Sequence, residues 1–274
     1  MAASDPWRTL VRGAKPAAGS GLRWLVGRTQ GSAYLVVCRL TNFHEIMKTK
    51  TLEQLSLEEL ASIHLDIYDT PISLAVGYVR SCIGGLVTEI QQSRARASTR
   101  IFSPLYGGFA LLDQIGSCYT NTSIPACPNA DASGIKKALY YFCNMPYDSD
   151  EMKALYGLRN SLMHDGSLIS RGRYVSDQWK GPYHHFILGS DSQNIVDLPP
   201  APWDGDLESL TSAHRTRINQ RALTDLAINA VKVARQLLDD GNLGFSLKEG
   251  EIELYYRYLF HQLPAESDDS DAAG

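Results

Sequence analysis

The chain of 274 residues lacks the features of several protein classes. No apolar run approaches the roughly 20 residues that a membrane-spanning helix needs. The N-terminus has charged residues and no continuous apolar segment, so we expect no secretory signal. The net charge of -4 and the pI of about 6.0 argue against a strongly basic nucleic-acid coat protein. They leave room for RNA chemistry in a small, locally basic cleft.

Cysteine is scarce and scattered. The five cysteines are odd in number and widely separated: Cys38, Cys82, Cys118, Cys127 and Cys143. Disulfide frameworks have even numbers and regular spacings, so we expect free thiols in a reducing cytoplasm. The spacings also contain no close-set ligand pair of the usual zinc kind. We therefore expect no metal and no other cofactor.

Composition divides the chain into three parts. Apolar residues make up 44% of the chain, which is enough for a substantial core. Residues 1–30 mix glycines with arginines and a lysine, and predict a loose basic arm. Residues 31–263 are expected to form one helical domain. The small and acidic residues 264–274 predict a disordered tail.

Apolar residues at intervals of three and four predict a succession of helices. Thr70-Pro71 and Ser103-Pro104 are start signals, because each places a capping residue before a proline at the first helical position. Ala33–Leu40 fits a short strand or a buried helix segment. The expected helices are 52–69, 71–97, 103–121, 133–144, 150–166, 212–240 and 249–263.

Residues 167–198 interrupt the helical pattern. Glycines and a proline separate short apolar stretches there, so we expect a β-hairpin or loop excursion attached to a mainly α-helical bundle. The excursion mixes cations with aromatic residues: Arg171, Arg173, Lys180, Tyr174, Trp179 and Tyr183. Such mixtures favour contacts with single-stranded RNA, and a solvated hairpin with its aromatic residues packed inward explains them equally well.

Three more arginines, Arg215, Arg217 and Arg221, fall in the first turns of the expected helix 212–240. Positive charges oppose the helix dipole at that end. They therefore indicate an anion or a partner surface. We take four arginines as candidate substrate-binding residues: Arg171, Arg173, Arg215 and Arg217.

The most informative stretch ends the expected helix 150–166. Leu155, Leu158 and Leu162 are spaced three and four apart and predict a buried stripe. Gly166 is suited to the left-handed cap that ends many helices.

Three polar residues of this stretch carry its chemistry. Asn160 and His164 are four apart and share one face of the helix. Arg159 lies five positions before His164, roughly 140° around the helix. The helix alone therefore does not bring arginine and histidine together. Either the arginine side chain curls over, or a second copy of the helix supplies the partner group.

The sequence Arg159-Asn160, followed by three residues and His164, resembles the Rx4-6H signature of the HEPN superfamily (higher eukaryotes and prokaryotes nucleotide-binding). The resemblance covers residues 150–170 in detail and residues 103–240 only in helical layout. It implies an all-α bundle, frequently a two-fold dimer in which the two motifs face each other. Many members are metal-independent endoribonucleases, and others are inactive scaffolds or antitoxin partners.

The resemblance implies that the chain cleaves RNA in a toxin–antitoxin or phage-defence setting, with Arg159, Asn160 and His164 as catalytic residues. It implies a homodimer, with an antitoxin or regulatory protein as a further partner. Attack by the neighbouring 2′-hydroxyl requires proton transfer and charge stabilisation at phosphorus. Histidine transfers protons near neutral pH, and arginine presents a planar fork to phosphate oxygens. The implied products carry 2′,3′-cyclic phosphate and 5′-hydroxyl ends.

Two other interpretations explain the same three residues. In a non-catalytic dimerisation or interaction module, they hold the helix end and the dimer interface by hydrogen bonds. In a purely structural role, Arg159 pairs with a carboxylate such as Glu151 or Asp148, and His164 lies near the helix C-terminus, where a cation is favoured. A nuclease requires Arg159 and His164 to be exposed in one cleft, whereas closed ion pairs indicate a structural role.

Overall fold

The computed structural model describes residues 43–190 and 192–262. The described residues from His44 onward belong to one compact unit. The expected basic arm of residues 1–30, the segment Ala33–Leu40 and the expected tail of residues 264–274 lie outside the described residues.

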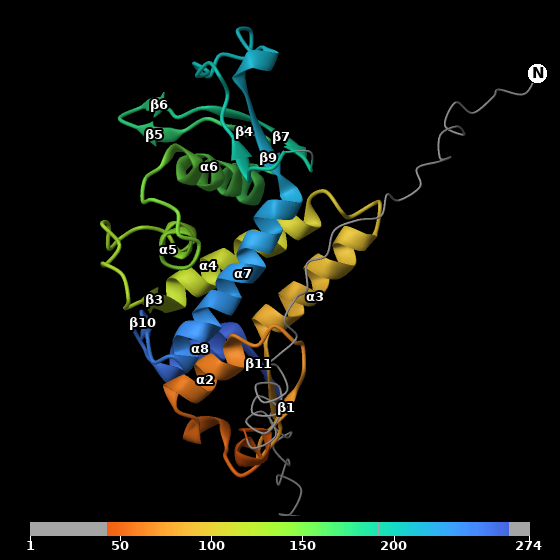
Figure 1. Ribbon diagram of the computed structural model, residues 1–274, viewed down its shortest axis with the longest axis vertical. Helices are drawn as coiled ribbons and strands as arrows, with labels where there is room; N and C mark the ends of the chain where they lie inside the picture. Colours follow the sequence, from red (N-terminus) through yellow and green to blue (C-terminus); the bar gives the residue numbers. More distant parts are fainter. Residues whose placement is uncertain (1–42, 191, 263–274) are drawn as a thin grey trace, which may run out of the picture. The chain divides into compact units, whose positions relative to one another are not determined.

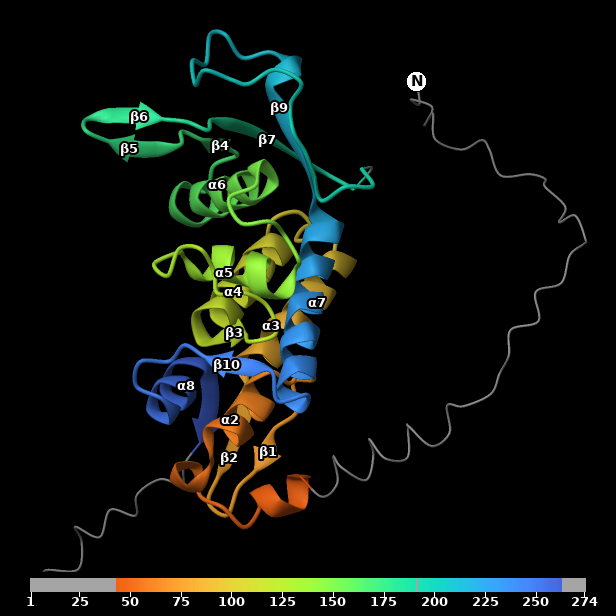
Figure 2. The same cartoon turned by 60° about the vertical axis from the view of Figure 1, so that its left-hand side comes forward.

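Helices and short strands are interspersed along the described chain (Figures 1 and 2). The helices are η1 Leu52–Gln54, α2 Leu57–His64, α3 Cys82–Ala95, α4 Ser103–Cys118, α5 Gly134–Phe142, α6 Asp150–Asp165, η2 Ser212–His214, α7 Gln220–Asp239 and α8 Glu251–Tyr258. The strands are β1 Ile72–Ser73, β2 Tyr78–Ser81, β3 Tyr119–Asn121, β4 Ile169–Ser170, β5 Arg173–Val175, β6 Gln178–Lys180, β7 His184–Gly189, β8 Val196–Asp197, β9 Arg215–Asn219, β10 Leu243–Phe245 and β11 Leu259–Gln262.

The expectation of a mainly α-helical, HEPN-like bundle is wrong, because the described chain is an α+β mixture with four small sheets. Several strands replace parts of the expected helices. The β1–β2 hairpin occupies the start of 71–97, β9 the start of 212–240, and β11 the end of 249–263. Short apolar runs fit either structure by periodicity. Pairing with distant segments, as between β2 and β11, satisfies their backbone groups as strands.

The segment 71–97 shows how a local signal misleads. Gly77 has φ 75°, a left-handed conformation that turns the chain between β1 and β2. The helix begins only after this hairpin. Ser81 is its N-cap, and the hydroxyl of Ser81 accepts a hydrogen bond from the Gly84 amide at 3.1 Å. The cap-plus-proline pair Thr70-Pro71 precedes a strand and does not start a helix.

The helical core is built around α4. This helix contacts α3, α5 and α7, and its apolar side is fully buried. The contact with α5 is close because Gly116 has no side chain. A Cβ atom on Gly116 would lie 2.6 Å from the Ala138 backbone nitrogen and closer still to the Gly134 carbonyl. Two backbones can pack at this distance only where one residue is glycine.

A four-stranded sheet covers α6, with the strand order β4-β7-β9-β8. Strands β7 and β9 are parallel, and the other neighbours are antiparallel. The buried side of β7 and β9 faces α6 and carries His184, Phe186, Thr216 and Ile218. Figure 2 shows α6 against this sheet, with the β5–β6 hairpin extending beside it. The expected excursion after α6 is therefore a set of strands, and β9 completes their sheet.

Gly116→Ala should destabilise the protein by about 1–3 kcal/mol, because the added methyl group overlaps the α5 backbone. Urea unfolding of the variant and the wild type measures the difference. Gly85→Ala is the matched control, since a Cβ there meets no described atom within 4 Å, and it should raise stability by up to about 1 kcal/mol. Equal stability of Gly116→Ala and wild type would contradict the described helix contact.

His64 makes the stability of the fold depend on pH. It is fully buried, where its Nδ1 lies 2.8 Å from the Tyr119 hydroxyl and its Nε2 lies 3.3 Å from Gln114 Oε1. Burial lowers the pKa of His64 to about 4, and the hydrogen bond to Gln114 opposes this shift. As the pH falls, His64 of the unfolded chain binds a proton near the ordinary histidine pKa. His64 of the folded chain binds one only near its lowered pKa.

The free energy of unfolding should therefore fall by about 3 kcal/mol from His64 alone as the pH decreases from about 6.5 to about 4. Urea titrations across this range check the effect. His64→Gln should be less stable at neutral pH, and the variant should lose this part of the pH dependence. The idea fails if wild type and His64→Gln show parallel pH profiles.

Candidate active site

Helix α6 begins and ends where its local sequence predicts. Ser149 caps the first turn, and its hydroxyl accepts a hydrogen bond from the Met152 amide at 3.2 Å. Gly166 ends the helix with φ 61°, and its amide donates to the Leu162 carbonyl at 3.1 Å. The predicted helix 150–166 is confirmed to within one residue.

The buried stripe of α6 determines which side chains remain for chemistry. Leu155, Leu158 and Leu162 are buried, as predicted. Gly157 lets the sheet approach, because a Cβ atom on it would lie 3.1 Å from Ser170 Oγ. With these sides against the core and the sheet, Asn160 is left half-buried and His164 exposed.

The Arg159 side chain reaches both other motif residues. Its Nη1 donates to Asn160 Oδ1 at 3.1 Å and lies 3.3 Å from His164 Nε2. A guanidinium has no acceptor, so Arg159 donates and Nε2 accepts in this contact. The arginine therefore curls over along a single helix, and a second helix is not needed to bring these groups together.

The same guanidinium is anchored by Asp113 of α4. Its Nε and Nη2 lie 3.0 and 2.9 Å from Asp113 Oδ2, and both side chains are about one quarter exposed. The other carboxylate oxygen, Oδ1, accepts a hydrogen bond from the Ile135 amide at the start of α5 at 3.0 Å. Asp113 thus joins three helices and fixes the direction of Arg159.

The partner that sequence reasoning proposed for Arg159 is wrong. Asp148 lies 3.5 Å from Lys153 instead, and no ion pair with Glu151 is formed among the described residues. The true partner, Asp113, is 46 positions away in the sequence. No spacing rule along one helix connects positions so far apart, so the sequence carried no signal for this pair.

A cleft of about 840 Å³ lies beside the motif. Asn160 and His164 form part of its wall, and Arg171 follows β4 along another part. The segment 203–208 closes the opposite side, where Trp203 is buried and its Nε1 donates to the Asp206 carbonyl at 2.8 Å. Arg159 is not among the described residues that line it, so the histidine faces the cleft and the arginine supports it from the side.

The charge of this cleft differs from the expected basic cleft. Asp165, Asp206 and Glu208 line it and are exposed, against Arg171 as the single arginine among its described lining residues. Sequence reasoning missed Asp206 and Glu208, because no spacing along the chain connects them with the end of α6.

The candidate substrate-binding arginines do not form one group. Arg171 lines the cleft. Arg215 and Arg217 lie on strand β9 and are exposed on the sheet face that is turned away from α6. Their expected place in the first turns of a helix is wrong, because the helix starts at Gln220. Arg173 belongs to β5, and its side chain lies outside the described part of the chain.

The described thiols are free. They are Cys82, Cys118, Cys127 and Cys143. Burial raises the pKa of Cys118 and of Cys143 to about 12, so neither is a nucleophile at neutral pH. Within the described ranges, no three His, Cys, Asp or Glu side chains are grouped so that they could hold a metal ion. None of the helices described combines the length and apolar character that crossing a membrane requires.

Comparison with known proteins gives no relative: no family model, no curated protein and no solved structure matches the chain.

Asp113→Asn tests the anchoring of Arg159. The amide keeps an acceptor for Ile135 and loses the charge, so we expect a loss of about 1–2 kcal/mol in stability. A double-mutant cycle with Arg159→Gln should give a coupling of about 1 kcal/mol. Asp148→Asn is the matched control and should cost little, because its pair with Lys153 is more exposed. Additive effects of the Asp113 and Arg159 substitutions would contradict the described pair.

Proposed function

We propose that the protein is a metal-independent endoribonuclease of the HEPN type, with Arg159, Asn160 and His164 as its catalytic residues. One observation carries the proposal: the Arg159 Nη1 atom lies 3.3 Å from His164 Nε2, while His164 is exposed on the wall of a cleft. A fixed cation beside an exposed imidazole can supply the charge stabilisation and the proton transfer that cleavage by a 2′-hydroxyl requires.

In the proposed reaction, neutral His164 accepts the proton of the ribose 2′-hydroxyl through Nε2. The 2′-oxygen attacks phosphorus, and the bond from phosphorus to the 5′-oxygen breaks. The 5′-oxygen takes up a proton, which gives a 5′-hydroxyl and a 2′,3′-cyclic phosphate. Proton transfer by histidine contributes typically 10²–10⁴-fold to such a step.

Arg159 has two roles in this proposal. Before substrate binds, it donates to Nε2 and to Asn160. When a phosphate enters, one of its oxygens takes the place of Nε2 at the Arg159 Nη1 atom and frees Nε2 to take the proton. Asp113 holds the arginine on this side of α6 throughout. Asn160 lines the same cleft and orients the phosphate by its amide.

The proton donor for the 5′-oxygen is assigned to a second copy of the chain. A two-fold dimer with facing α6 helices brings a second His164, in its protonated form, to the leaving oxygen. One histidine then gains a proton and the other loses one in each cleavage. We place this homodimer in the cytoplasm, in a toxin–antitoxin or phage-defence setting, with an antitoxin or regulatory protein as its partner. Arg171 lies on the wall of the same cleft as His164 and binds the phosphates next to the reacting one. The exposed Arg215 and Arg217 bind the strand farther along the sheet.

A second candidate function, a non-catalytic interaction module, is favoured by two observations. The cleft presents three carboxylates against one arginine among its described lining residues, which repels a polyanion. Arg159 is also held in an ion pair by Asp113. In this alternative, the three motif residues stabilise the end of α6 and an interface, and the acidic cleft receives a basic segment of a partner protein.

RNA cleavage in EDTA by the wild type and His164→Ala separates the two functions. The nuclease proposal expects EDTA-resistant cleavage that falls at least 10²-fold in His164→Ala, with cyclic-phosphate ends identified by mass spectrometry. His214→Ala is the matched control, because its ring bonds to Thr211 outside the cleft, and it should cleave normally. Folding and oligomeric state are checked by circular dichroism and light scattering.

The other outcomes are equally informative. Cleavage that survives in His164→Ala would show that the site lies elsewhere. No cleavage by the wild type across several RNA pools, together with a folded dimer, would favour the interaction module.

A further inference from the structure

A second cleft of about 630 Å³ has the opposite charge to the first. It lies where the C-terminal end of α3, the segment 100–104, the end of β7 and the first turn of α7 meet. Arg94, Arg100 and Arg221 line it, and none of its described lining residues is an aspartate or a glutamate. None of these three arginines belongs to the Arg159–His164 group, so this cleft is independent of the proposed cleavage site.

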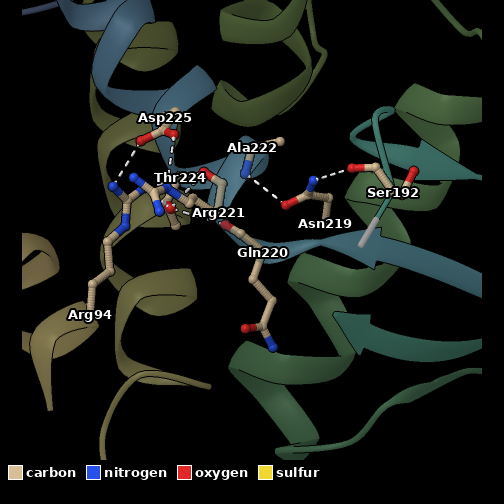
Figure 3. Close-up of polar contacts among 8 residues, drawn as sticks. All are labelled: Arg94, Ser192, Asn219, Gln220, Arg221, Ala222, Thr224 and Asp225. Carbon is tan, nitrogen blue, oxygen red and sulfur yellow. Dashed lines mark hydrogen bonds and ion pairs between the residues drawn. The ribbon is translucent and has the colours of Figure 1, made fainter. Parts of the chain in front are cut away.

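Arg94 is held in a fixed orientation across this cleft (Figure 3). Its Nη1 donates to Asp225 Oδ1 at 2.7 Å, and its Nη2 donates to the Arg221 carbonyl at 3.3 Å and to the Thr224 hydroxyl. Its Nε is buried and has no hydrogen-bond partner among the described residues. Three residues of α7 therefore position this one guanidinium, and two of its five N–H donors, one on Nε and one on Nη1, are left unused.

One carboxylate, that of Asp225, is shared between two of the three arginines. Asp225 pairs with Arg94 and lies 4.0 Å from Arg221 Nε. Arg221 is 79% exposed, and Arg100 forms no ion pair with any described residue. Three cations and one anion leave an excess of two positive charges. Like charges brought together repel one another, and a bound anion relieves that repulsion.

The surroundings favour phosphate over other anions. Guanidinium groups present parallel donors that match phosphate oxygens, and several of them fit adjacent phosphates. The N-terminal end of α7, a helix of 20 residues, adds partial positive charge. Ile101, Pro104 and Leu188 supply apolar surface for a sugar or a base. The volume lies within the range of about 300–1,000 Å³ for small-molecule sites.

We infer that this second cleft binds adjacent phosphate groups of a nucleotide, either free or within an RNA strand, through Arg94, Arg100 and Arg221. Arg94 is the fixed donor. The exposed Arg100 and Arg221 close on the ligand from two sides.

The test uses full-length protein and two probes that the proposed nuclease cannot cleave. One is a fluorescent 2′-O-methyl oligonucleotide, which has no attacking hydroxyl, and the other is ATP. Binding is measured by fluorescence anisotropy and by calorimetry over a range of salt concentrations. The variant is the double substitution Arg100→Gln with Arg221→Gln, which leaves the Arg94–Asp225 pair intact. Arg257→Gln on α8 is the matched control, since it removes one exposed arginine elsewhere.

The expected result is at least a ten-fold loss of affinity for one of the probes in the double variant, with Arg257→Gln near the wild type. For the oligonucleotide, the slope of log affinity against log salt should fall by about 1.4, because two phosphate contacts are lost. A loss confined to ATP identifies the ligand as a free nucleotide, and a loss for the oligonucleotide identifies an RNA strand. The inference is overturned if neither probe binds the wild type. It is also overturned if the double variant and Arg257→Gln lose affinity equally.

Loss of cleavage and loss of this binding are separate outcomes. A protein that binds either probe through these arginines and cleaves no RNA would contradict the proposed nuclease and support the phosphate site.

Discussion

The pair between Arg159 and Asp113 is the interaction on which the motif depends. Asp113 lies on the central helix α4 and receives both the Arg159 guanidinium and the amide that begins α5. This single carboxylate fixes the direction in which the arginine crosses α6, and so brings it to His164. Because a guanidinium only donates, Nε2 is the acceptor in this contact. The contact is therefore made at the nitrogen that the proposed reaction uses.

The two clefts carry opposite charges, which the net charge of the whole chain does not reveal. A net charge of -4 averages over an acidic cleft beside His164 and a basic one beside Arg94. If an RNA strand is the ligand, its phosphates are attracted by the second cleft and repelled by the wall of the first. Only the part of the strand that contacts Arg159 and Arg171 can then approach the histidine. Binding of the strand at the second cleft would hold the polyanion near the carboxylates of the first cleft in spite of their repulsion.

The sequence predicted the features that depend on neighbouring residues. Helix α6, its cap at Gly166 and its stripe of leucines follow from spacing and backbone preference, and all are present. It could not predict β9 or β11, because a strand is defined by a partner far along the chain. The ion pair of Arg159 and the cleft around Arg94 likewise join segments separated by about 46 and 130 positions.

Competition for Arg159 bears most directly on function. In the resting structure this side chain is divided among Asp113, Asn160 and His164. Two charge-assisted contacts to Asp113 anchor the guanidinium. The single contact to His164 Nε2 is longer, at 3.3 Å, and is exposed. A phosphate can replace that last contact without disturbing the anchor. A catalytic arginine requires such an exchangeable contact at the cleft, whereas the closed pair with Asp113 is all that a structural arginine needs.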